Sequence, residues 1–162
     1  MDDAKRVLLI TEAVRYCKRV ARMGMPPSCY SKALREPIYY LWESRGGGNK
    51  DDRAKFRSKA SVGLERGGGK LQIDHAIPFK YLQVKLLALT PVTPSTVKHA
   101  LEKLEKYTMT VLITEDEHRR LNGKGYRSSM PDGWDEIDPL ARYKALGIEI
   151  VENKKIVENK KI

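Results

Sequence analysis

The chain has 162 residues, of which 41% are hydrophobic and 32% are charged, which suits one domain with a modest helical extension. Its 31 Lys and Arg residues exceed its 21 Asp and Glu residues, giving a formal net charge of +10. No apolar run approaches membrane-spanning length and the first residues lack a secretory apolar core, so we expect a cytoplasmic protein rather than a membrane or secreted one.

The excess of positive charge favours a polyanionic partner, because neutralising phosphates releases their counterions. Nucleic acid is the first expectation, and a basic protein without such a partner, or one that touches acidic lipid, stays an alternative. Residues 1–35 and 45–70 each hold eight basic and three acidic residues, whereas residues 131–138 are acidic. Neither Cys17 nor Cys29 belongs to a Cys-x-x-Cys pair, so nothing supports a disulfide framework or a zinc knuckle.

The first predicted element is a helix that Asp2 or Asp3 caps and that ends before Gly24 and Pro26-Pro27. Apolar residues recur along it at helical spacing: Ile10, Val14, Cys17 and Ala21. Its opposite face is basic and would either be solvated or contact phosphates: Arg15, Lys18, Arg19 and Arg22.

Pro37 suits the first turn of a second short helix, residues 38–43, which a triple glycine then stops. Its aromatic residues are expected to pack, with at least one left partly exposed: Tyr39, Tyr40 and Trp42. Residues 45–70 are rich in glycine and basic, which indicates a phosphate-seeking segment or a flexible linker, with a short polar helix over residues 51–60. The basic residues of this segment are Arg45, Lys50, Arg53, Lys55, Arg57, Lys59, Arg66 and Lys70.

Alternating apolar and polar residues predict a strand over residues 71–73 that ends in Asp74-His75. A mostly buried helix over residues 79–89, a turn over residues 90–94 and a helix from Ser95 to about Lys106 follow.

The β-branched and apolar residues 107–113 predict a second strand. Thr114 and Glu117 form a capping box, which starts a helix that Gly123 and Gly125 end. A turn around Met130 and Trp134 is expected to pack against the core and to lead to a final helix over residues 139–146. Residues 151–156 recur as residues 157–162, and this tail is interpreted as a terminal extension.

The Asp74-His75 pair is the first candidate for chemistry. Adjacent residues at a strand end point to opposite sides, so the pair supplies a carboxylate on one side and an imidazole on the other. A carboxylate is a hard ligand for a divalent cation, and a neutral imidazole can take a proton from water near neutral pH. On its own, such a dipeptide is more often structural than catalytic.

The context of this pair adds a resemblance to a known family. The run from Ile73 to Pro78 resembles the first half of the HNH (ββα-metal) nuclease motif, which reads apolar-Asp-His-apolar-apolar-Pro. In that family a second strand and a helix return a His or Asn to the metal, and His118 matches this place. Asn122, one turn later, is either a second ligand or an orienting partner. The resemblance covers about residues 70–130.

The sequence departs from the family motif in three respects, and the first of them affects the expected fold. About 32 residues separate Pro78 from Val111, so two inserted helices are required, while the middle Asn and the Cys pairs of many members have no counterpart. The expected fold is α+β and mainly helical, with a small β-hairpin and helix as its core. Its expected parts are a basic N-terminal helical region (1–69), a nuclease core (70–130) with a helical insert (79–106), and a C-terminal turn, helix and tail (131–162).

The resemblance also implies a mechanism for phosphodiester hydrolysis. His75 would act as general base on a water in line with the phosphorus, leaving a 5′-phosphate and a 3′-hydroxyl. Asp74 and His118 would hold one divalent ion, for which Mg²⁺ is the expected identity and Mn²⁺, Zn²⁺ or Ni²⁺ are also compatible. Five cations are candidates for phosphate contacts: Lys80, Arg119, Arg120, Lys124 and Arg127. Ion pairs of Glu115 with Arg119 and of Asp116 with Arg120 are the rival account for two of them.

The expected function is therefore a DNA endonuclease, for example of phage, restriction or defence type. The breadth of the same family also allows a nuclease that acts on structured RNA, or a secreted bacterial toxin. A non-catalytic nucleic-acid binder on a ββα scaffold needs the charge without the metal. A small regulatory protein that binds an acidic protein is the third hypothesis. The oligomeric state and the target sequence stay open.

Overall fold

The computed structural model describes residues 1–64 and 70–154, which form two compact units. Met1–Gly47 and Phe79–Glu105 make up the first, which we call the helical unit. The second, called the sheet unit, contains Gly48–Pro78 and the described residues that follow Glu105. The predicted parts 1–69, 70–130 and 131–162 differ from this division, because the helices of the insert pack with the N-terminal helices.

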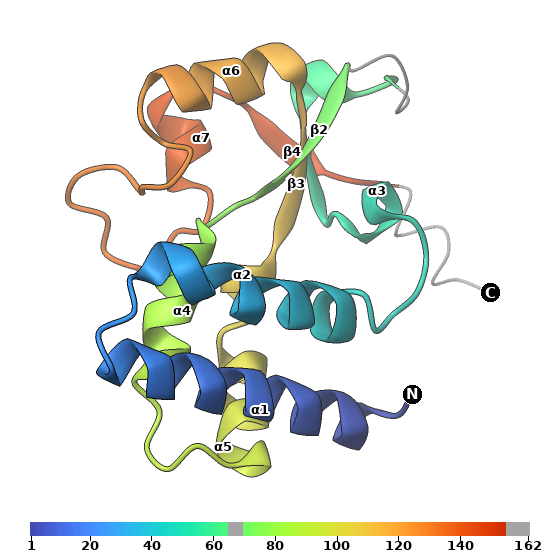
Figure 1. The fold of residues 1–162 in the computed structure, drawn as a ribbon. Helices are drawn as coiled ribbons and strands as arrows, with labels where there is room; N and C mark the ends of the chain where they lie inside the picture. Colours follow the sequence, from blue (N-terminus) through green and yellow to red (C-terminus); the bar gives the residue numbers. More distant parts are fainter. Residues whose placement is uncertain (65–69, 155–162) are drawn as a thin grey trace. The chain divides into compact units, whose positions relative to one another are not determined.

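The helical unit consists of four α-helices and one π-helical turn within its described residues (Figure 1). They are α1 (Asp3–Arg22), α2 (Pro27–Pro37), the π-helical turn η1 (Ile38–Glu43), α4 (Phe79–Leu87) and α5 (Pro94–Lys103). The Asp2 side chain accepts a hydrogen bond of 2.8 Å from the Lys5 amide and so caps α1, as predicted. The buried face of α1 contains the predicted Ile10, Val14 and Cys17, whereas Ala21 is half-buried.

Helix α2 was not predicted from the sequence. Pro26-Pro27 does end α1, but Pro27 is also the first residue of the next helix, where a missing N–H costs nothing. Pro37 lies at the end of α2, and not in the first turn of a separate helix, and the chain runs on into η1. Trp42 is buried and Tyr40 is 66% exposed, so the expectation that one of these aromatic residues stays exposed is confirmed.

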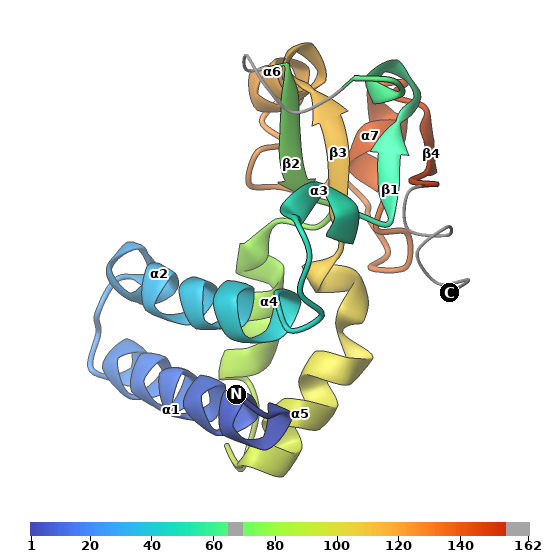
Figure 2. The same cartoon turned by 90° about the vertical axis from the view of Figure 1, so that its right-hand side faces the viewer.

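The sheet unit holds four strands, three α-helices and a 3₁₀ turn in its described residues, and another 3₁₀ turn, Glu105–Thr108, leads into it. They are α3 (Lys50–Arg53), β1 (Phe56–Ser58), a 3₁₀ turn (Lys59–Ser61), β2 (Leu71–His75), β3 (Thr110–Thr114), α6 (Glu115–Gly123), α7 (Ala141–Ala145) and β4 (Ile150–Glu152). The strand order is β2-β3-β1-β4, in which β3 pairs antiparallel with β2 and parallel with β1, and β4 pairs antiparallel with β1 (Figure 2).

One face of this sheet is covered by α6 and α7 (Figure 1). Leu121 of α6 and Tyr143 of α7 pack with Val111 and Ile113 of β3 in a buried cluster. Such a cluster supplies the apolar burial that a small sheet needs for stability. The observed architecture confirms the predicted α+β, mainly helical fold class.

Two short strands were missed. The predicted helix over residues 51–60 is wrong, since only Lys50–Arg53 is helical and Phe56–Ser58 forms β1. The interpretation of the tail as an extension is wrong for its first residues, because Ile150–Glu152 forms β4 and Asn153 is buried. The rest of the tail, residues 155–162, lies outside the described residues, as does Arg66.

Other boundaries shift by a few residues. The cap of α5 is Thr93, which forms a capping box with Thr96, and not Ser95. The second strand begins at Thr110 and not at residue 107, because Tyr107 belongs to the preceding 3₁₀ turn. The last helix is α7, which is shorter than the predicted 139–146. None of the helices formed by residues 1–64 and 70–154 is long and apolar enough to cross a membrane.

Candidate functional site

The Asp74-His75 pair ends strand β2, next to β3. Asp74 is in register with Val111 and His75 with Thr110, so the two side chains lie on opposite faces of the sheet. Val111 packs with Leu121 of α6, which places the Asp74 carboxylate on the sheet face that α6 and α7 cover. Both side chains are half-buried, and both belong to the sheet unit together with α6.

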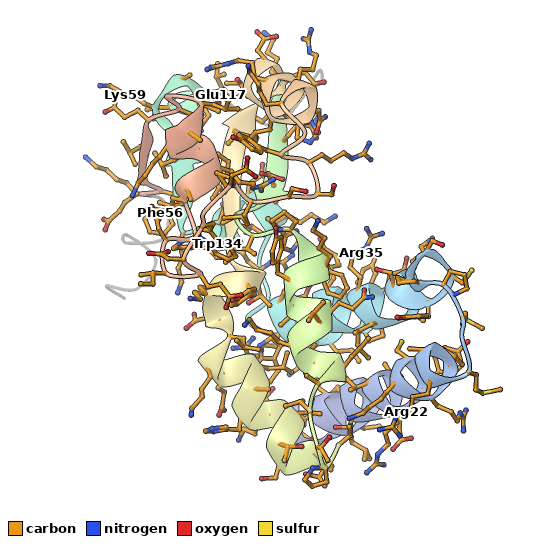
Figure 3. The ribbon with its side chains drawn as sticks, turned by 90° about the vertical axis from the view of Figure 1, so that its left-hand side faces the viewer. Arg22, Arg35, Phe56, Lys59, Glu117 and Trp134 are labelled. Carbon is orange, nitrogen blue, oxygen red and sulfur yellow. The ribbon has the colours of Figure 1, made fainter. Side chains whose placement is uncertain are left out.

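Helix α6 starts directly after β3, and its start is fixed by Glu117. The Thr114 hydroxyl accepts from the Glu117 amide at 3.2 Å, and the Glu117 carboxylate accepts from the Thr114 amide at 2.8 Å, which confirms the predicted capping box. The same carboxylate, of the Glu117 labelled in Figure 3, accepts a hydrogen bond of 2.6 Å from Ser58 of β1. Glu117 therefore joins the start of α6 to two strands, which sets the position of the next residue, His118.

The second link between α6 and the sheet lies on the sheet face that carries the Asp74 side chain. The Gln72 side chain of β2 donates a hydrogen bond of 2.6 Å to the carboxylate of Glu115, the first residue of α6. His118 follows within the second turn of the helix and is half-buried, whereas Asn122 is exposed. The structure thus joins β2, β3 and α6 in the predicted strand–strand–helix arrangement.

Arg142 of α7 contacts the backbone at the end of β2, next to the Asp74-His75 pair. Its side chain is only 1% exposed, and its Nε donates to the Ala76 carbonyl at 3.0 Å. One terminal nitrogen, Nη2, donates to the His75 carbonyl and, at 2.6 Å, to Oδ2 of Asp74. The other donates to the Tyr126 carbonyl. A rigid guanidinium with five donors can hold several acceptors at once, so Arg142 fixes the end of β2.

Tyr143, next to Arg142, is the second partner of Asp74. Its hydroxyl donates a hydrogen bond of 2.7 Å to the same Oδ2 atom. The Asp74 side chain is 16% exposed, and within the described part of the chain its other oxygen, Oδ1, makes no hydrogen bond. Sequence reasoning missed both Arg142 and Tyr143, because neither belongs to a local motif and 68 residues separate Arg142 from Asp74.

Burial, reinforced by the nearby Asp74 carboxylate, raises the pKa of the Tyr143 hydroxyl well above its ordinary value. Above about pH 10 the unfolded chain loses this proton while the folded chain keeps it, so the free energy of unfolding falls as the pH rises.

We expect Tyr143→Phe to flatten this alkaline loss of stability by up to about 1.4 kcal/mol per pH unit. Urea unfolding on either side of pH 10 measures it, with Tyr40→Phe, at an exposed tyrosine, as the matched control that keeps the wild-type slope. A Tyr143→Phe slope equal to that of Tyr40→Phe would contradict the assignment.

The five candidate phosphate contacts differ in their surroundings. Arg119 forms ion pairs with Asp116 at 2.9 Å and Glu115 at 3.9 Å, so the rival account of helix pairing holds for it. Arg120 donates to the Leu146 carbonyl and does not pair with Asp116. Lys80 belongs to the helical unit, where its ammonium lies 5.3 Å from the ring centre of Tyr81.

Lys124 and Arg127, which follow α6 closely, are both exposed. Neither forms an ion pair within residues 1–64 and 70–154. Of the five predicted cations, these two are the ones in the sheet unit whose side chains make neither an ion pair nor a hydrogen bond with the described residues.

The donor atoms of the predicted metal ligands suit a divalent cation. Three of their side-chain groups make no hydrogen bond to the described residues: Oδ1 of Asp74, the imidazole of His118 and the side-chain amide of Asn122. Carboxylate and amide oxygens with an imidazole nitrogen form a mixed set that Mg²⁺ or Mn²⁺ can accept, with waters completing the shell. Among the described residues, no group of three or more His, Cys, Asp or Glu side chains is arranged to hold a metal ion. The third predicted ligand, an Asn, is not one of these types.

Comparison of the chain with models of known protein families, with curated proteins and with solved structures finds no match. The case for a function therefore lies in the residues of the site.

Proposed function

We propose that this protein is a metal-dependent endonuclease that hydrolyses phosphodiester bonds of DNA, in the manner of the HNH nucleases that its motif resembles. One observation carries the proposal: β2 ends in Asp74-His75, pairs antiparallel with β3, and β3 leads directly into the helix that holds His118. The net charge of +10 supports a polyanionic substrate. DNA cleavage by a phage, restriction or defence enzyme in the cytoplasm is the setting we favour.

In this proposal His75 is the general base. A half-buried imidazole at a strand end can accept a proton from water while its backbone is held still. The Arg142 guanidinium supplies that restraint, because it binds the carbonyls of His75 and Ala76. Arg142 is therefore a positioning residue, acting through His75 and Asp74 without touching substrate.

Asp74 and His118, with Asn122, would hold one divalent ion, most simply Mg²⁺. When bound, this ion would offset negative charge at the phosphoryl oxygens and at the leaving 3′-oxygen. On the protein side, Arg142 and Tyr143 donate to Oδ2 of Asp74, which orients the carboxylate and leaves Oδ1 for the ion. Lys124 and Arg127 would contact the phosphates flanking the cleaved bond.

The contacts of Asp74 also favour a second candidate function. A carboxylate that accepts from two buried donors has a sufficient structural reason to be present. A nucleic-acid binder that keeps the ββα scaffold without catalysis would need this contact and the basic surface, but no metal.

Cleavage of supercoiled plasmid separates the two candidates. We expect nicking in the presence of Mg²⁺ and none in the presence of excess EDTA, with structured RNA as a parallel substrate. Preparations of His99→Ala, which changes an exposed histidine of α5, should behave as the wild type does. DNA binding with no cleavage under Mg²⁺, Mn²⁺, Zn²⁺ or Ni²⁺ would contradict the nuclease and favour the binder.

A further inference from the structure

A basic cavity in the helical unit lies outside the site described above. It has a volume of about 540 Å³ and lies between one face of α1 and the turn that precedes α5. Four of its eight lining residues are cations from α1: Arg15, Lys18, Arg19 and Arg22. The others are Met23, Thr90, Pro91 and Val92.

Two of these cations hold the walls of the cavity together. Arg15 donates to the Val92 carbonyl through Nε at 3.1 Å and through Nη2 at 3.0 Å. Lys18 donates to the Leu89 carbonyl and, at 3.1 Å, to the Thr90 hydroxyl. The turn is thereby fixed against α1, so the cavity is a formed feature of this unit.

The other two cations have no counterion in the described part of the chain. Arg19 and Arg22 are exposed, and neither side chain makes an ion pair or hydrogen bond there (Figure 3 labels Arg22 at the end of α1). Arg15, by contrast, forms an ion pair of 2.5 Å with the Glu12 carboxylate. Like charges gathered around one cavity repel each other, and an anion bound between them would relieve this repulsion.

The length of the basic face indicates the kind of anion. From Arg15 to Arg22 the helix rises by about 10.5 Å, at roughly 1.5 Å per residue. Phosphates of one duplex strand recur about every 3.4 Å along the axis, so this face matches several successive phosphates better than one isolated phosphate. No aromatic side chain is among the lining residues, so nothing in the cavity offers a stacking surface for a base.

We infer that this cavity is a second nucleic-acid contact, which binds the phosphate backbone of DNA without reading its sequence. The choice of DNA rests on the proposed function, whereas the affinity for successive phosphates follows from the cavity itself. Arg19 and Arg22 bind the phosphates, and Arg15 and Lys18 keep the turn in place and add positive potential.

The experiment measures binding of a fluorescently labelled short DNA duplex to the full chain, by anisotropy, in EDTA and over a series of salt concentrations. Arg19→Gln/Arg22→Gln is compared with Arg35→Gln/Lys103→Gln, which removes the same charge from exposed residues of α2 and α5 outside the cavity. The first variant should lower the salt slope by about two and the affinity by about tenfold per arginine near 0.1 M salt. The second should stay close to the wild type.

Equal losses in both double variants would overturn the inference, because only net charge would then matter. Unchanged binding by Arg19→Gln/Arg22→Gln would overturn it as well. Phosphatidylserine vesicles and inorganic pyrophosphate serve as competitors, and an Arg19- and Arg22-dependent preference for either over DNA would also overturn it. A protein that binds DNA through Arg19 and Arg22 but never cleaves it would remove the nuclease proposal and support this inference.

Discussion

Replacing His75 with alanine is expected to slow plasmid cleavage by about 10²–10⁴-fold, the usual contribution of a general base. A neutral imidazole can take a proton from water near neutral pH, whereas the Asp74 carboxylate already accepts hydrogen bonds from Arg142 and Tyr143. Its backbone carbonyl stays bound to Arg142 in the variant, so the end of β2 should keep its position. Single-turnover cleavage with saturating Mg²⁺ measures the effect.

Two comparisons isolate this role of His75. DNA affinity in EDTA should be the same for His75→Ala and the wild type, because the contact with phosphates lies with the cations. His75→Asn, which keeps a polar side chain, should be as inactive as His75→Ala if proton transfer is what is lost. A His75→Ala rate within a few-fold of the wild type would show that the imidazole is not the base.

Replacing Arg142 with methionine is expected to lower the free energy of unfolding by about 3–5 kcal/mol, the cost of breaking a buried ion pair by removing one partner. The change leaves the Asp74 carboxylate without its guanidinium and removes the donors to the carbonyls of His75, Ala76 and Tyr126. Urea denaturation of the full chain measures the loss.

Arg120→Met is the matched control, since Arg120 is exposed and donates to a single carbonyl. It should cost about 1 kcal/mol or less. Adding Asp74→Asn to Arg142→Met should cost less than the sum of the two single changes, because the unpaired carboxylate is then gone. Strict additivity, or an Arg142→Met loss no larger than that of Arg120→Met, would contradict the described contact.

The elements with a strong local signal were predictable. The Asp2 cap and the apolar spacing of α1, and the Thr114–Glu117 capping box of α6, act within a few residues and do not depend on the rest of the fold. Strands β2 and β3 were also predicted, since both carry a run of alternating or β-branched residues. In the structure these two strands pair antiparallel, with Asp74 opposite Val111.

The missed strands have no such signal. Both β1 and β4 span three residues, and β1 lies between β3 and β4, so its backbone hydrogen bonds come from segments far away in the chain. Helix α2 was missed because Pro27 was interpreted only as the end of α1, although proline also suits the first position of a helix.

The residues of the candidate site show the same distinction between local signals and long-range contacts. Asp74, His75 and His118 were found because they stand in a motif with fixed local spacing. Arg142 and Tyr143 meet Asp74 only through packing of α7 against the sheet, and no spacing in the sequence indicates that contact.

This contact also decides which ligand can be tested cleanly. A change at Asp74 removes a proposed metal ligand and a partner of buried Arg142 together, so loss of activity in an Asp74 variant would not separate the two roles. His118 is half-buried and its imidazole makes no hydrogen bond with the described residues, so His118→Ala should cost little stability. His99→Ala, at an exposed position of α5, provides a histidine change of equal size elsewhere.

Titration of Mn²⁺ into wild type, His118→Ala and His99→Ala, followed by electron paramagnetic resonance, therefore asks whether the helix contributes a ligand to a bound ion. We expect the wild type and His99→Ala to bind Mn²⁺ with equal affinity, and His118→Ala to bind it at least about tenfold more weakly while melting like the wild type without metal. Equal affinity of all three proteins, or no Mn²⁺ binding by the wild type, would contradict a metal site built from the end of β2 and the start of α6.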